Sequence, residues 1–143
     1  MNVMAAFAAA AAVLSVAVIV WYVLLVIANW RIFTKAGEAG WKSIIPVYNM
    51  YISYKISWNT MMFWIMLAVM ALNIIFSAIG GTAAAVGKIF AVASAVIMIA
   101  QSYKLAKAFG HGVGFTIGLV ILNPIFLLIL GFGSSQYIGK SDN

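Results

Sequence analysis

Long runs of apolar residues alternate with short polar segments along this chain. Four of the runs approach or exceed the roughly 20 residues that a helix needs to cross a bilayer. They cover residues 3–29, 60–79, 83–105 and 113–130, and glycine-rich or polar segments separate them. We therefore predict an all-α integral membrane protein with four transmembrane helices. The chain is expected to form a single membrane domain over residues 1–143.

The segment 41–58 has a different pattern. Its polar residues fall on one side of a helical wheel, and apolar and aromatic residues fall on the other, three or four positions apart. Pro46 should begin or kink such a helix, because proline lacks a backbone N–H. Tryptophan and tyrosine suit the headgroup region of a bilayer. We predict an amphipathic interfacial helix between the first and second spans, with anchors at Trp41, Tyr48, Tyr51, Tyr54 and Trp58.

Basic residues predict the orientation. Most of them lie between the first and second spans or just after the third: Arg31, Lys35, Lys42, Lys55, Lys104 and Lys107. Cytoplasmic loops carry an excess of Lys and Arg. We therefore expect these regions to face the cytoplasm, and both termini to lie on the non-cytoplasmic side.

Composition narrows the classes of function. Only 7% of the residues are charged and 66% are hydrophobic, so a soluble domain is not expected. The only acidic residues, Glu38 and Asp142, lie outside the apolar runs, which argues against proton relays at membrane depth. There is no cysteine for disulfides or thiolate chemistry. The net charge of +6 comes from scattered residues, which is typical of topology signals and of attraction to anionic lipid rather than of nucleic-acid binding.

Small residues recur at every fourth position in two of the spans. They are Ala83, Gly87, Ala91 and Ala95 in the third, and Gly110, Gly114 and Gly118 at the start of the fourth. Residues of this size let two helix backbones approach closely in lipid. We predict these faces to be helix-packing interfaces, either within one four-helix bundle or against another subunit.

A few polar residues are candidates for chemistry. His111 is the only histidine and thus a weak candidate ligand for a metal, haem or pigment, but a protein-held metal site needs several ligands. Lys88 lies near a helix end, where its ammonium can reach the interface. Asn73 and Asn123 bridge helices or, in the alternative, line a polar pathway.

Motifs for catalysis are missing from the sequence. It has no Gly-x-Ser-x-Gly nucleophile elbow, no paired carboxylates and no glycine-rich phosphate loop. Ser102 and Lys104 are two positions apart, so a helix points them in different directions. We expect no enzyme activity, no cofactor and no metal.

Three blocks of residues carry a family resemblance. They are Ile32–Gly37 with Gly40-Trp41 and Ile44–Asn49, Leu105–Gly110 with Gly114-Phe115, and Pro124 with Gly131–Gly133 and Tyr137. Over roughly residues 20–137 the chain resembles a family of small prokaryotic polytopic membrane proteins of unknown function. Members are sometimes labelled signal peptidase, a label that this sequence does not support, because it lacks a plausible serine–lysine pair. The resemblance implies a four-helix protein of the prokaryotic plasma (bacterial inner) membrane.

Three hypotheses for function follow from these patterns. The first is a non-catalytic accessory subunit or scaffold that packs against other membrane chains, or against itself as a homo-oligomer, with membrane lipid as a further partner. The second is a small transporter or channel component that uses the polar groups between helices. The third is an intramembrane enzyme.

Overall fold

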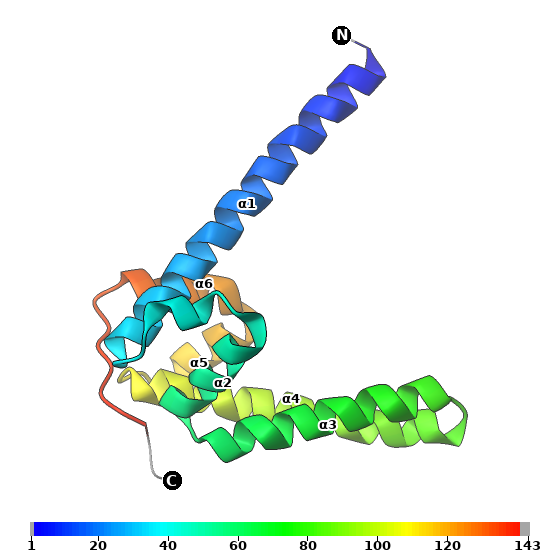
Figure 1. The fold of residues 1–143 in the computed structure, drawn as a ribbon, viewed down its shortest axis with the longest axis vertical. Coiled ribbons are helices and arrows are strands. Elements are labelled where there is room, and N and C mark those ends of the chain that lie inside the picture. Colours follow the sequence, from blue (N-terminus) through cyan, green and yellow to red (C-terminus); the bar gives the residue numbers. More distant parts are fainter. Residues whose placement is uncertain (1, 141–143) are drawn as a thin grey trace.

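The computed structural model describes residues 2–140, and every regular element in that part of the chain is a helix. In order these are α1 (Val3–Lys35), the short 3-10 helix η1 (Gly40–Ser43), α2 (Pro46–Ser57), α3 (Thr60–Ile79), α4 (Thr82–Ala108), α5 (Val113–Ile121) and α6 (Asn123–Phe132). The predicted all-α class is confirmed. Figure 1 shows α1 projecting alone and the α3–α4 pair projecting in another direction, with the other helices gathered where these meet.

Among the described residues, α1, α3 and α4 are the helices that are long and apolar enough to cross a membrane. α1 ends at Lys35 rather than at the predicted residue 29. Only Ala28, Ile32 and Phe33 on α1 are buried, all near its C-terminal end. α1 contacts η1, α2 and α6 but neither α3 nor α4, so most of its length has no protein neighbour within the described chain.

The predicted interfacial segment 41–58 forms two elements. Pro46 begins α2, as its missing N–H favours, and the residues just before it form η1. Ser53 and Ser57, which belong to the predicted polar face, turn toward α4: Gln101 donates hydrogen bonds to their hydroxyls at 3.1 and 3.0 Å. Because α2 packs against η1, α3 and α4, a helix lying free on the membrane surface is not confirmed.

α3 and α4 form a long antiparallel hairpin (Figure 1). Asn59 caps the start of α3 by accepting a hydrogen bond from the Met62 N–H at 2.8 Å. Gly80 and Gly81 form the turn with φ values of 79° and 60°, a backbone region that favours glycine. These bounds agree with the helices predicted for the second and third spans, except that α4 begins at Thr82 and continues to Ala108.

The predicted fourth span, residues 113–130, is not one helix. It is broken at Leu122, where φ is −119° and ψ is 50°, because Pro124 has no N–H for the Val120 carbonyl and its ring clashes with that carbonyl. α6 then folds back on α5: a Cβ at Gly118 would lie 2.2 Å from the Phe126 ring, and the Phe115 and Phe126 rings are 5.0 Å apart. Four crossings are therefore not confirmed.

The main core lies where the helix ends meet. Its buried side chains come from the C-terminal ends of α1 and α4 and from α2, α5 and α6: Ile32, Phe33, Ile52, Ile56, Leu105, Leu119 and Leu130. Close packing of this kind stabilises helix contacts in lipid, where apolar burial alone gives little driving force. The gathered helix ends bring together several polar residues that are distant in the sequence.

Candidate functional site

The main cluster of polar contacts lies beside this core, and we call it the polar junction. It joins the end of α1, the following loop, α2, the segment before α5 and residues 133–140. Its members are Arg31, Lys35, Glu38, Lys42, Lys55, His111, Ser135 and Tyr137. The sequence identified most of these residues singly but not their association.

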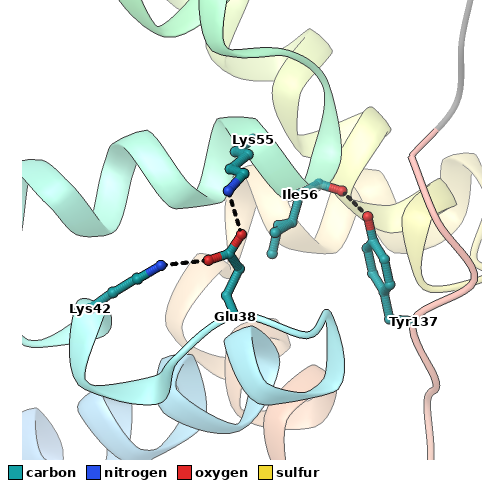
Figure 2. A network of polar contacts seen from close by, with 5 residues as sticks. All are labelled: Glu38, Lys42, Lys55, Ile56 and Tyr137. Carbon is teal, nitrogen blue, oxygen red and sulfur yellow. Dashed lines mark hydrogen bonds and ion pairs between the residues drawn. The ribbon is translucent and has the colours of Figure 1, made fainter.

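Glu38 is the centre of the junction. Its two carboxylate oxygens accept hydrogen bonds from Lys42 and Lys55, each at 2.7 Å, as Figure 2 shows. The Glu38 side chain is only 12% exposed. The hydrogen bonds from Lys42 and Lys55 hold the pKa of the Glu38 carboxyl below its ordinary value, and Glu38 in turn raises the pKa of Lys42. Glu38 thus ties the loop after α1 to α2.

Tyr137 fastens the C-terminal segment to α2. Its hydroxyl donates a hydrogen bond to the Ile56 carbonyl at 2.8 Å (Figure 2). Its ring packs edge-on against Phe109 at 5.5 Å, and burial raises the pKa of the Tyr137 phenol. The Ile138 N–H donates to the Ala108 carbonyl at 2.7 Å, so residues 133–140 run along the end of α4.

Arg31 and Lys35 bind the C-terminal end of α6. The Arg31 Nε donates to the Gly131 carbonyl at 2.8 Å, and the Lys35 Nζ donates to the carbonyls of Leu130 and Gly133. The last carbonyls of a helix lack partners within the helix and carry partial negative charge, so cations stabilise them. These two predicted topology charges therefore also hold α6 against α1.

His111 closes the base of the α5–α6 hairpin. Its Nε2 lies 2.7 Å from the Ser135 hydroxyl, and its ring stacks on Phe115 at 4.1 Å. A Ser–His pair is also the core of many nucleophilic sites, but these need a third group to orient the histidine. In residues 2–140 the one carboxylate side chain, Glu38, is bonded to two lysines. No group of three His, Cys, Asp or Glu residues gathers in that part of the chain to bind a metal.

The predicted aromatic anchors divide into two kinds. Trp41 is 50% exposed, whereas Tyr54 is buried against Phe63. Tyr48, Tyr51 and Trp58 are half-buried. The five residues therefore do not share one exposed face. Burial raises the pKa of the Tyr54 phenol.

Only some residues of the two predicted small-residue faces pack against a neighbouring helix. A Cβ at Gly87 would lie 2.8 Å from the Ser77 hydroxyl of α3, and Gly118 packs on Phe126. Ala83 is half-buried, and Ala91 and Ala95 are exposed. A Cβ at Gly110 would lie 3.9 Å from the Ile138 Cδ1, and one at Gly114 would have no atom within 4 Å. An α-helix has 3.6 residues per turn, so residues at every fourth position move gradually around the helix. After about two turns they no longer face the same neighbouring helix.

One close contact was missed from the sequence. A Cβ at Gly131 would lie 2.6 Å from the Ala28 carbonyl oxygen, so α6 approaches the backbone of α1 directly. Gly131 belongs to the third block of the family resemblance, which was a signal for its importance. Asn73 and Asn123 are not brought together, because α3 contacts neither α5 nor α6. Ser102 is buried, while Lys104 is half-buried on another side of α4.

All six predicted topology charges lie at the same end of the molecule. Arg31, Lys35, Lys42 and Lys55 belong to the polar junction, and Lys104 and Lys107 lie in the last turns of α4, which pack in the same core. Lys88 lies far from this end, in the second turn of α4, and is exposed. The junction thus concentrates positive charge at one end.

Comparison with known proteins gives one match. Residues 41–140 match the model of a family of unknown function. The predicted resemblance to such a family is confirmed over this range, which includes most of the quoted blocks but not Ile32–Gly37 or Gly40. No curated protein and no solved structure matches the chain.

Proposed function

We propose, from the premise that this chain belongs to the family of unknown function DUF5684, that the protein is a non-catalytic membrane subunit or scaffold. Its partners are other membrane chains or a second copy of itself. By the family resemblance, its location is the prokaryotic plasma membrane.

The observation that carries this proposal is the tip of the α5–α6 hairpin. α5 and α6 have 9 and 10 residues, so each rises about 13 to 15 Å, half of a hydrocarbon core of about 30 Å. The chain therefore turns near the bilayer midplane. Pro124 has no N–H to offer the Val120 carbonyl, and Leu122 and Asn123 are exposed. Lipid does not satisfy such backbone, which occurs at membrane depth only where protein or a water-filled cavity covers it.

The isolation of α1 supports the same function. Its apolar length makes no contact with α3 or α4, although three helices of one small protein usually pack together. The exposed part of α1 is rich in alanine, and small residues allow close helix packing in lipid. A partner helix that packs on α1 therefore complements this surface.

The position of the polar junction supports a revised topology. With the six basic residues in the cytoplasm, the N-terminal end of α1 lies outside. Because the base of the α5–α6 hairpin is closed at His111 and Ser135, residues 133–140 lie on the cytoplasmic side with it. The sequence-based prediction placed both termini outside and required residues 113–130 to cross the membrane once.

A second candidate is a transporter or channel component, which the same hairpin tip favours. Exposed Asn123 at midplane depth suits the wall of a water-filled cavity that is completed by another subunit. Within residues 2–140, neither α5 nor α6 contacts α3, so the chain does not place Asn73 beside Asn123.

Cysteine crosslinking in native membranes tests the subunit proposal. The chain contains no cysteine, so Asn123→Cys carries a single thiol. A thiol-to-photoreactive crosslinker at this position should join the protein to a second polypeptide. Ile89→Cys, at an exposed position of α4, is the matched control and should label lipid alone. If Asn123→Cys also labels lipid alone and native extraction yields a free monomer, the proposal is wrong. Solute flux through liposomes that contain the extracted complex distinguishes the second candidate from the first.

A further inference from the structure

A groove of about 610 Å³ runs between α4 and α5. Val96, Ala100 and Tyr103 of α4 form one wall, and Val113, Ile117 and Ile121 of α5 form the other. Its volume is within the range of about 300–1,000 Å³ that is usual for small-molecule sites. The one polar side chain of α5 in the groove, Thr116, donates its hydroxyl proton to the Gly112 carbonyl at 3.1 Å. The walls therefore offer apolar contact only.

One end of this groove is basic. Val96, Ala100, Tyr103 and Lys107 follow one face of α4 at steps of three or four residues, so Lys107 continues the groove wall toward the helix end. Its ammonium lies 5.4 Å from the centre of the Tyr103 ring, which itself lines the groove. Lys107 is exposed, and no acidic side chain pairs with it within residues 2–140. Lys104 lies on the flank of the same turn.

The groove has the depth of one leaflet. From Val96 to Tyr103 a helix rises about 10 Å, and the wall from Val113 to Ile121 rises about 12 Å. Half of a hydrocarbon core is about 15 Å. A partner helix that crosses the membrane needs a surface about twice as long, whereas an acyl chain of one leaflet matches this depth.

We propose that this groove binds one acyl chain of an anionic phospholipid, with the lipid phosphate at Lys107. The apolar walls hold the chain, and the charge at the mouth selects the headgroup, because basic pockets between membrane helices bind acidic lipids. The net charge of +6 reinforces this selection. The inference goes beyond the proposed function and does not depend on it, since its occupant is a lipid between α4 and α5 and not a second protein chain.

Native mass spectrometry of the full-length protein tests the site. The protein is purified in mixed micelles that contain equal amounts of phosphatidylglycerol and phosphatidylcholine. We expect retained phosphatidylglycerol to exceed phosphatidylcholine, and Lys107→Gln to lower that preference about fivefold, the effect of one basic residue at an anionic surface. Lys88→Gln makes the same charge change near the other end of α4 and should leave the preference unchanged. Ala100→Trp, which fills the groove, should reduce retention of both lipids.

Photolabelling of the unmodified protein provides a second measurement that does not depend on a variant's folding. A phosphatidylglycerol with a diazirine in one acyl chain should label peptides that contain residues 96–103 or 113–121. Equal retention of the two lipids, equal effects of the two lysine variants, or labelling confined to other helices would overturn the proposal.

Discussion

The α3–α4 and α5–α6 hairpins are both strongly apolar, but they are held in different ways. The α3–α4 hairpin has helices of 20 and 27 residues that pack chiefly on each other and turn at two glycines. The α5–α6 hairpin has helices of 9 and 10 residues, turns at an Asn-Pro pair, and packs on α1 and α4. Arg31 and Lys35 bind its last carbonyls, and His111 and Ser135 join its two ends.

This difference teaches that the apolar content of a segment does not decide whether it forms one long helix or folds back on itself. Residues 113–130 are as apolar as residues 60–79, yet they return to the end from which they started. The two segments differ in the position of the polar side chains that hold them, namely the hydrogen bonds of Arg31, Lys35 and His111 at the base of the α5–α6 hairpin. The three predictions below test this difference between the two hairpins and the role of the polar junction.

The largest expected effect concerns the side of the membrane on which residues 133–140 lie. Single-cysteine variants Asn2→Cys, Thr82→Cys and Gln136→Cys are labelled in intact cells with an impermeant maleimide. We expect Asn2→Cys and Thr82→Cys to be labelled and Gln136→Cys to be labelled only after the cells are permeabilised. Labelling of Gln136→Cys together with Asn2→Cys would mean that α5 and α6 cross the membrane, and that the two hairpins do not differ in depth.

The next largest effect concerns two glycines, Gly131 and Gly87, that lie against a neighbouring helix. Gly131→Ala places a methyl group 2.6 Å from the Ala28 carbonyl oxygen, and a backbone atom cannot move aside. We expect a loss of about 1–3 kcal/mol in the free energy of unfolding, as for other overpacked sites. Gly87→Ala meets the Ser77 hydroxyl at 2.8 Å, which can rotate away, so its cost should be smaller.

Thermal unfolding in detergent measures the stability of these variants. Gly114→Ala is the control, because no atom lies within 4 Å of its new methyl group. It should stabilise α5 by about 0.5–1 kcal/mol, the advantage of alanine over glycine within a helix. Equal losses for Gly131→Ala and Gly87→Ala would show that both hairpins depend on interhelical contact to the same degree.

The smallest effect concerns Glu38. Its pKa is lowered in the folded protein, so its contribution to stability is complete above the ordinary value of 4.5 and is lost as the pH falls through the lower folded value. We expect the melting temperature to fall on acidification over this range, and Glu38→Gln to weaken the dependence. At neutral pH, Glu38→Gln should speed amide hydrogen exchange in α2 but leave the middle of the α3–α4 hairpin unchanged. Faster exchange throughout α3 and α4 would contradict a local role.

Local signals in the sequence were enough to predict the α3–α4 hairpin. Asn59, the Gly80-Gly81 pair and Gly110 lie at the ends of its helices, and each ends or begins a helix for reasons within its own few residues. Pro46 likewise begins α2 as predicted. The helical wheel of 41–58 did not indicate that the hydroxyls of Ser53 and Ser57 accept hydrogen bonds from Gln101 of α4.

Contacts between residues that are distant in the sequence decided the rest of the fold. Residues 113–130 were predicted as one span although they contain Pro124, and the contacts of Gly118 with Phe126 and of Gly131 with Ala28 accompany the fold-back of the chain. The polar junction joins positions up to 100 residues apart, as in the bond from Arg31 to Gly131. The sequence gives the charge of Glu38 but not the lysines that surround it.

The helix α1 is longer than a crossing of an average bilayer needs. Its 33 residues rise about 50 Å, whereas the 20 residues of α3 rise about 30 Å and match an average hydrocarbon core without tilting. A helix longer than the core tilts to keep its apolar side chains in lipid. Figure 1 shows α1 at an oblique angle to the α3–α4 pair. We therefore expect α1 to stand more upright in a thicker membrane, which changes its angle to the other helices at the polar junction.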